Sequence, residues 1–154
     1  MFHRTAVTRT LSLVLVLFLL AFIWGNSLLP GTESAEMSGS LTALLERIFG
    51  PAANFERLHH YVRKLAHMTE YAVLALCLGW FLFLWQKPGR DLWPLHPLWG
   101  LITACIDETI QLFSLGRGSS LLDVWIDMAG FTLAFLLWRL LSKGARRRDR
   151  ESAA

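Results

Sequence analysis

Two acidic residues and a glutamine stand near the end of an apolar stretch. In the segment DETIQLF, Asp107, Glu108 and Gln111 fall within two helical turns, and residues 92–106 before them contain no Asp, Glu, Lys or Arg. A charge at the centre of a bilayer costs about 2.5 to 3.5 kcal/mol on insertion scales, so such residues are usually kept for a function. Their types suit proton transfer, cation binding or hydrogen bonding to a polar ligand.

A second polar stripe lies earlier in the chain, in the segment RKLAHMTEY. Arg63, His67 and Glu70 are four and three residues apart, which places them on one face of a helix, and Lys64 and Tyr71 flank them. A histidine beside a carboxylate can act as a general acid or base, whereas an arginine suits an anionic group. The stripe is therefore compatible with catalysis and with anion binding.

A third polar group follows the acidic segment. The loop SLGRGSS contains Arg117 and Ser120, and the apolar segment after it carries Asp123 and Asp127 one turn apart. Because glycine has no side chain, backbone N–H groups beside it are accessible to an anion. A serine can contact a phosphate or cap the following helix. The loop thus suits an anionic ligand, with a plain capped turn as the equally simple alternative.

Four apolar segments could position these groups, since a spanning helix needs about 20 residues. The chain has 154 residues, enough for one domain, and its 54% hydrophobic content exceeds that of most soluble domains. We predict a single all-α domain, 1–154, an integral membrane bundle with spans at residues 8–29, 64–86, 92–113 and 121–142.

The connections complete this predicted arrangement. The outer loop, 30–63, contains the polar connection PGTESAEMSGS and a short amphipathic helix that starts at Ser38 or Ser40. Residues 143–154 form a basic cytoplasmic tail, which we interpret as a topology anchor and not as a nucleic-acid site. The first apolar run could instead be a signal peptide, but WGNSLLPG poorly matches the small-residue cleavage pattern.

The distribution of basic residues predicts the orientation. Ten Lys and Arg lie on the side of the termini and the KPGRD turn, against five in the other loops. The positive-inside rule makes the former side cytoplasmic. We therefore expect a multi-pass protein of the bacterial cytoplasmic membrane with both termini in the cytoplasm.

Antiparallel spans bring the three polar groups to the same depth. The second span starts at the outer side, the third ends there and the fourth begins there, whereas inner segments such as AVLALCLGWFLFLW carry no charge. We predict one shared polar pocket that opens outward, in which Asp107 or Glu108 pairs with a cation of the second span. Alternatively the charges mark helix ends in the headgroup region, but Glu70, Asp107 and Asp127 lie one to two turns inside.

A metal site is a further alternative. His67 and Glu70 resemble half of a metal-binding helix pair, to which Asp107, Glu108 and Asp123 could add oxygen ligands for a divalent ion. However, the motif has only one helical histidine, since His59 and His60 lie outside the predicted span, and Arg63 and Arg117 would compete for the carboxylates. The sequence analysis therefore predicts neither a metal nor another cofactor.

The segments RKLAHMTEY and DETIQLFSLGRGSSLLDVWIDMAG together resemble the VanZ-like membrane proteins, whose pattern joins R-K-x-x-H-x-x-E-Y to D-E-x-x-Q, an arginine loop and an aspartate-led last helix with a following glycine. More loosely, Asn26 and Ser27 resemble the family's polar stretch after the first helix. Asp127 stands where the family typically has Asn. The residues carried over are Arg63, Lys64, His67, Glu70, Tyr71, Asp107, Glu108, Gln111, Arg117, Asp123 and Gly130.

The resemblance implies a cell-envelope setting without specifying a reaction. The founding member of the family is associated with resistance to teicoplanin, a lipid-tailed glycopeptide that targets cell-wall precursors, and we expect a connection to glycopeptide resistance. The expected partners are membrane lipids, a lipid-linked cell-wall precursor or a lipoglycopeptide, and no nucleic acid. The sequence predicts no particular oligomeric state.

The favoured function is binding of a lipid-linked or amphiphilic anion, whose charge Arg63 and Arg117 hold. The alternative is a membrane-embedded enzyme with His67 as acid or base and Glu70 or Asp107 orienting it. A proton-coupled carrier is disfavoured because we find no titratable path toward the cytoplasm. The residues expected to bind the anion or lipid are Arg63, Lys64, Tyr71, Glu108, Gln111, Arg117, Ser120, Asp123 and Asp127.

Overall fold

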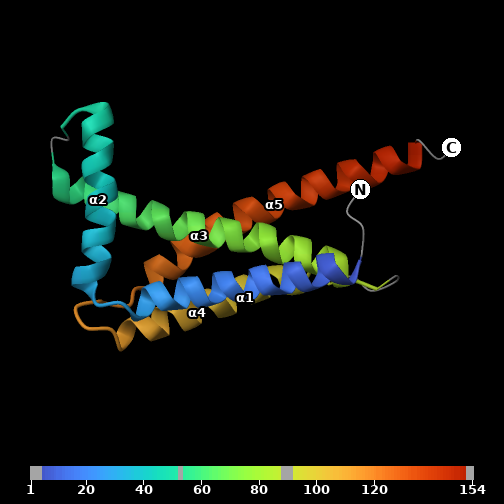
Figure 1. The fold of residues 1–154 in the computed structure, drawn as a ribbon, viewed down its shortest axis with the longest axis horizontal. Helices are drawn as coiled ribbons and strands as arrows, with labels where there is room; N and C mark the ends of the chain where they lie inside the picture. The colour runs from blue at the N-terminus through green and yellow to red at the C-terminus, as the bar shows by residue number, and fades with distance from the viewer. Residues whose placement is uncertain (1–4, 52–53, 88–91, 152–154) are drawn as a thin grey trace.

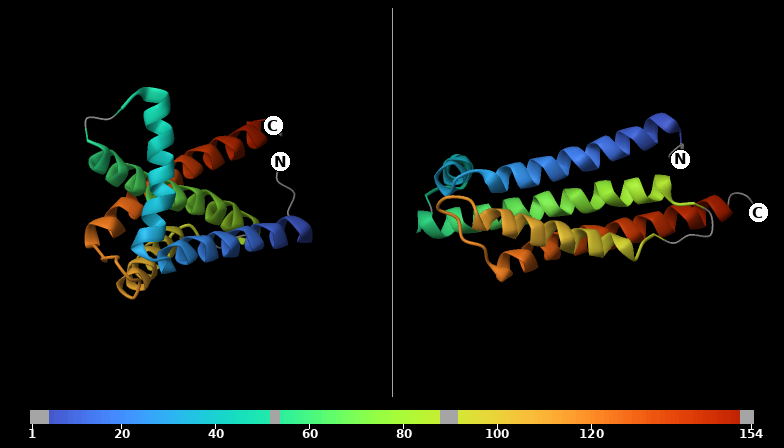
Figure 2. Two further views of the ribbon diagram at one scale, coloured as in Figure 1. Left: turned by 60° about the vertical axis from the view of Figure 1, so that its left-hand side comes forward. Right: turned by 90° about the horizontal axis from the view of Figure 1, so that it is seen from below.

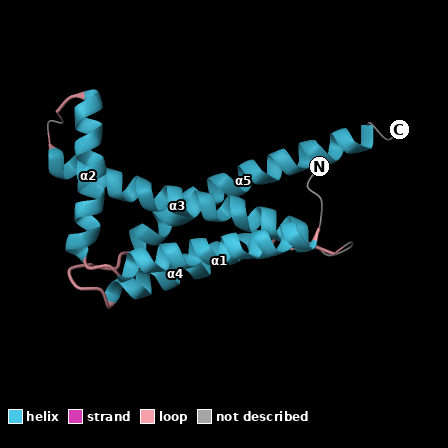
Figure 3. Cartoon of the chain, in the orientation of Figure 1, coloured by secondary structure: helices cyan, strands magenta, loops and turns pink. Residues whose placement is uncertain are grey.

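The computed structural model describes residues 5–51, 54–87 and 92–151, with side chains up to residue 141. These residues form five helices and no strand (Figure 3), which confirms the predicted all-α class. The helices are α1 (Ala6–Leu28), α2 (Gly31–Phe49), α3 (Phe55–Trp85), α4 (Leu95–Leu112) and α5 (Leu121–Glu151).

Three helices in the described part of the chain are long and apolar enough to cross a bilayer. They are α1, α3 and the Leu121–Leu141 part of α5. Helix α4 is not among them because its 18 residues include Asp107, Glu108 and Gln111, which lower its hydropathy. Four spans are therefore not confirmed by length and composition.

Helices α1, α3, α4 and α5 run roughly along one axis of the molecule, and successive ones alternate in direction (Figure 1). Helix α2 lies across them at one end, as both views in Figure 2 also show. The start of α1 and the end of α5 lie at the opposite end (Figure 1). The predicted KPGRD turn falls mostly in residues 88–91, which lie outside the described residues, as do the side chains of the predicted basic tail.

Helix α2 is longer than the predicted amphipathic helix. It starts at Gly31, so the predicted polar connection is helical. The Ser38 hydroxyl donates to the Ser34 carbonyl at 2.9 Å, and the Ser40 hydroxyl donates to the Glu36 carbonyl at 3.0 Å. These serines therefore lie inside the helix and do not cap it.

Helix α3 also begins before its predicted start. The Asn54 side chain accepts a hydrogen bond from the Arg57 backbone N–H at 3.0 Å, so Asn54 caps the helix almost three turns ahead of residue 64. At the other end of the chain, α5 continues as one helix to Glu151, through most of the predicted tail.

The core lies between α3 and the helices around it. Tyr71, Leu74 and Ala75 on α3 and Phe131 on α5 are almost completely buried. A Cβ atom at Gly130 would lie 2.1 Å from the Met68 carbonyl oxygen, so only glycine permits this approach of α5 to α3. The outward-facing side chains are largely apolar, as expected for surfaces in lipid.

Candidate functional site

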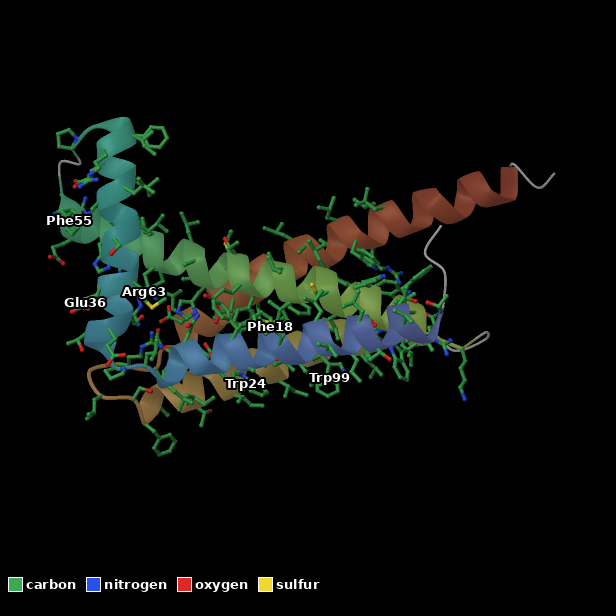
Figure 4. All side chains as sticks on the ribbon, in the orientation of Figure 1. Phe18, Trp24, Glu36, Phe55, Arg63 and Trp99 are labelled. Carbon is green, nitrogen blue, oxygen red and sulfur yellow. The ribbon has the colours of Figure 1, made fainter. Side chains whose placement is uncertain are left out.

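A polar cavity of about 200 Å³ lies where α3, α4, α5 and the α4–α5 loop meet. Figure 4 shows oxygen and nitrogen atoms gathered near Arg63, where α2 crosses α3. The cavity contains most of the residues predicted for a shared pocket. Its lining is His60, Arg63, Lys64, His67, Glu108, Gln111, Gly116, Arg117, Gly118, Asp123, Ile126 and Asp127.

The remaining predicted residues lie next to this cavity. Asp107 and Tyr71 are completely buried, and Glu70 lines a second cavity. Ser120 contributes its backbone, because its N–H donates to Glu108 Oε2 at 2.7 Å. Its hydroxyl accepts from the Leu122 N–H at 3.2 Å, so the loop serine does cap α5.

Helix α1 supplies two polar contacts to the acidic residues. The Ser27 hydroxyl donates to Asp107 Oδ1 at 2.6 Å, and the Asn26 amide donates to Glu70 Oε1 at 3.2 Å. From the sequence alone, Asn26 and Ser27 only loosely resemble the family pattern. Their position is the stronger signal, since these two polar residues follow the apolar run 13–25 in the last turn of α1.

The glutamine of DETIQLF joins its two carboxylates. Gln111 Nε2 lies 3.1 Å from Asp107 Oδ2 and 3.3 Å from Glu108 Oε1, and donates to both. Asp107 therefore has neutral hydrogen-bond donors as its partners. We had expected a cation of the second span to meet DETIQLF, and no such ion pair is found among the described residues.

The cations of the site are only partly satisfied. Lys64 forms an ion pair with Asp123, and Arg117 Nη2 donates to the Ser34 hydroxyl on α2. The other two nitrogens of Arg117 have no partner among the described residues, and Arg63 forms no hydrogen bond or ion pair with them. Two guanidinium groups thus lack a carboxylate partner among the described residues.

The charges around the loop arginine act in opposite directions. Burial lowers the pKa of the Arg117 guanidinium, and the nearby Arg63 charge lowers it further, while Asp107, Glu70 and Glu108 oppose the change. An arginine stays protonated under these conditions, because its ordinary pKa exceeds 12. Arg117 therefore remains a positive charge inside the cavity.

Helix α2 and the end of α1 are both held against the α4–α5 loop. The Gly31 N–H of α2 donates to the Leu115 carbonyl at 2.8 Å, and the Ser114 hydroxyl donates to the Ser27 carbonyl of α1 at 2.6 Å. A Cβ atom at Gly31 would lie 2.4 Å from the Gly116 carbonyl oxygen. These contacts fix the first turn of α2 against the α4–α5 loop and bring Ser34 to Arg117.

A second cavity, also of about 200 Å³, lies beneath α2. It shares Arg63, His67 and Arg117 with the first one. Its other walls are more apolar, and its full lining is Asn26, Leu29, Ser34, Met37, Ser38, Leu41, Val62, Arg63, Ala66, His67, Glu70 and Arg117. Arg63 and Arg117 thus border a charged cavity on one side and a more apolar cavity on the other.

The geometry bears on the two alternatives that use His67, acid–base catalysis and metal binding. A His67 base oriented by a carboxylate is not assembled, because no hydrogen bond joins His67 to Glu70 or Asp107 among the described residues. By contrast, donor atoms of His67, Asp107 and Asp127 all lie within 4.8 Å of one another and could hold a metal ion.

One titratable residue, His96, lies in the part of the bundle where the argument against a proton-coupled carrier finds no titratable path. His96 on α4 is fully buried, and its Nε2 lies 2.8 Å from the Ala75 carbonyl oxygen. Its ring packs against Phe131 and Phe135 in tilted arrangements, at centroid distances of 5.0 and 4.5 Å. His96 lines neither cavity, so its contacts give it a role in packing α4 against α3 and α5.

Comparison with known proteins identifies the family. No curated protein and no solved structure matches the chain. A family model described as VanZ/LLP1 matches residues 12–142, which include both cavities and α1 to α4 with the apolar part of α5. The resemblance inferred from the sequence motifs is thereby confirmed, and the chain belongs to the VanZ/LLP1 family.

Proposed function

We propose that this VanZ/LLP1 protein binds an amphiphilic anion inside the membrane, such as a lipid-linked cell-wall precursor. The observation that carries the proposal is the pair of cavities that share Arg63 and Arg117. An anionic headgroup would occupy the polar cavity, where the guanidinium groups lack carboxylate partners. The attached chain would leave through the second cavity, along Leu29, Met37 and Leu41.

The proposal includes α4 as a fourth span in a bacterial cytoplasmic membrane, with both termini in the cytoplasm. The polar residues of α4 support this, because Asp107, Glu108 and Gln111 are at most 4% exposed. The side chains that α4 exposes include Leu98, Leu101, Ile102 and Ile106. A helix with its polar face turned into the bundle can cross a bilayer despite a lower mean hydropathy.

The charges of the pocket favour a phosphate or a similar anion over a neutral lipid. Arg63 and Arg117 come from different elements, α3 and the α4–α5 loop, and both border the two cavities. An arginine can form two parallel hydrogen bonds to a phosphate, and such bonds strengthen in surroundings of low dielectric constant. A glycopeptide with an acyl tail has the same amphiphilic character, which would link the pocket to the resistance expected from the family resemblance.

Binding can be tested with three compounds that separate charge from chain. The protein would be placed in nanodiscs of phosphatidylcholine and titrated with a fluorescent polyprenyl phosphate, the matching polyprenol and a short, water-soluble prenyl phosphate. We expect tight binding only for the polyprenyl phosphate. Loss of one charged hydrogen-bond donor costs about 1.5–3 kcal/mol, so Arg63→Gln and Arg117→Gln should each weaken binding by about 10- to 100-fold.

Arg57→Gln is the matched control, because Arg57 is an exposed arginine on α3 that lines neither cavity. It should bind as the parent protein does. Equal affinity for the polyprenol would show that the headgroup charge is not recognised. Unchanged binding in both cavity variants would show that the amphiphile binds elsewhere.

A further inference from the structure

Three potential metal ligands converge from three different helices. His67 lies on α3, Asp107 on α4 and Asp127 on α5, and one donor atom from each lies within 4.8 Å of the others. Ligand atoms bound at about 2.0–2.2 Å in a tetrahedral arrangement would be separated by roughly 3.4 Å. Side-chain rotations that move the donor atoms by about an ångström would therefore bring all three within bonding distance of one ion.

Asp127 gives an independent reason to place a cation here. Its side chain is 1% exposed, and neither carboxylate oxygen has a hydrogen-bond partner among the described residues. It lines the polar cavity together with His67. A buried carboxylate without a partner is strongly unfavourable and must acquire a proton or a cation.

The protein's own cations are not placed to fill this role. Lys64 is paired with Asp123, and neither Arg63 nor Arg117 forms an ion pair with a described carboxylate. Across the site, the carboxylates outnumber the Lys and Arg side chains by two: Glu70, Asp107, Glu108, Asp123 and Asp127 against Arg63, Lys64 and Arg117. A divalent cation would balance this difference if all the carboxylates are ionised.

The surroundings of Asp107 also leave it free to coordinate. Each of its oxygens accepts one hydrogen bond, from Ser27 and from Gln111, at 2.6 and 3.1 Å. A carboxylate oxygen has a second lone pair available for a metal. Hydrogen bonds of this kind orient the carboxylates that bind metals in proteins.

From this geometry we propose that His67, Asp107 and Asp127 bind one divalent first-row transition-metal ion such as Zn²⁺ or Mn²⁺. The imidazole ligand distinguishes this site from Mg²⁺ and Ca²⁺ sites, which use oxygen ligands. Three protein ligands leave coordination positions open on the cavity side, where a water or an oxygen of an anionic headgroup would bind. The metal site does not depend on the amphiphile, so each can be tested without the other.

The sequence indicated His67 and carboxylates of the neighbouring spans as possible ligands but could not single out this set, because each helix contributes a single ligand and no spacing motif connects them. Gly130, one turn after Asp127, sets the distance instead. Its backbone packs against the Met68 carbonyl, next to His67 along α3. The close contact between α3 and α5 therefore brings Asp127 to His67.

The metal alone is the probe. Purified full-length protein in detergent would be stripped with a chelator, incubated with Zn²⁺, Mn²⁺ or Mg²⁺, and freed of unbound ions. Bound metal per chain would be measured by mass spectrometry and the thermal midpoint by circular dichroism. We expect about one Zn²⁺ or Mn²⁺ per chain with a raised midpoint, and no comparable effect of Mg²⁺. His67→Gln and Asp127→Asn should each lose the metal and the shift.

His59→Gln is the matched control. His59 contacts Ser38 at 2.7 Å and lines neither cavity. This variant should retain the ion. Failure of the folded parent protein to bind metal would overturn the proposal and leave a proton on Asp127. Metal retained equally by His67→Gln and Asp127→Asn would also overturn it, since the ion would then lie elsewhere.

Discussion

The Ser27 hydroxyl on α1 donates to Asp107 Oδ1 on α4 at 2.6 Å, and both residues are completely buried. The bond joins the first helix to the acidic segment that first indicated a site. Because Asp107 receives its other hydrogen bond from Gln111 on its own helix, Ser27 is its hydrogen-bonded partner from another helix. Helix α1 thus does more than anchor the chain, since it helps to satisfy a buried carboxylate.

Replacing Ser27 by Ala should destabilise the protein by about 1–3 kcal/mol, because a buried carboxylate oxygen would lose its donor. Unfolding in mixed micelles, followed by circular dichroism, would measure the change. Ser12→Ala is the control, since Ser12 is equally buried on α1 but donates locally to the Arg9 carbonyl at 2.7 Å. Equal losses in the two variants would mean that the contact with Asp107 adds nothing special.

The close packing of α5 on α3 gives a second prediction. A Cβ atom at Gly130 would lie 2.1 Å from the Met68 carbonyl oxygen, so Gly130→Ala must push the two helices apart. Overpacking of this kind costs about 1–3 kcal/mol. The same unfolding measurement would detect it. Gly25→Ala on α1 should be neutral or slightly stabilising, because nothing lies within 4 Å of its Cβ position and alanine favours helices. A Gly130→Ala protein as stable as its parent would refute the close contact.

The three apolar spans were predictable because their patterns follow directly from the solvent around them. A bilayer imposes a minimum length on a helix and penalises charge, so runs such as LSLVLVLFLLAF indicate a span from composition alone. The gathering of charged residues near one depth was predictable for the same reason. The antiparallel order of the helices then placed His67, Asp107 and Asp127 at one end of the bundle.

The pairings within the site were not predictable in this way. Asp107 was expected to meet a cation because charge is the most visible property of a sequence, yet its partners are a hydroxyl and an amide. The helix predicted from the sequence starts later than α2, because TESAEMSGS has no apolar periodicity that would indicate a helix. The first turn of α2 is fixed by the contact between Gly31 and Leu115, which are distant in sequence.

These observed pairings lead to a third prediction, from a comparison of two double-mutant cycles. Lys64→Ala and Asp123→Ala should be coupled by about 0.2–1 kcal/mol, the range of partly exposed ion pairs. Arg63→Ala and Asp107→Ala should instead add within about 0.5 kcal/mol, because no ion pair joins them. Unfolding free energies in mixed micelles would give both couplings. A strong Arg63–Asp107 coupling with none for Lys64–Asp123 would reinstate the pairing expected from the sequence.

The last prediction concerns whether α4 crosses the membrane. If it does, the loop before it and the loop after it lie on opposite sides. Cys77 and Cys105, both free thiols, would be replaced by alanine, and single cysteines introduced by Lys87→Cys and Ser119→Cys. Both positions are exposed and lie on either side of α4.

A membrane-impermeant maleimide added to intact cells should label the Ser119→Cys protein, and the Lys87→Cys protein only after permeabilisation. This result follows from the excess of Lys and Arg on the side of the termini. The cysteine-free parent serves as the control for background labelling. If both positions label under the same condition, α4 does not cross, and the protein would have three spans with α4 folded back into the bundle. The reverse pattern would keep four spans but turn the polar cavity toward the cytoplasm, where a lipid-linked anion would have to enter from the inner leaflet.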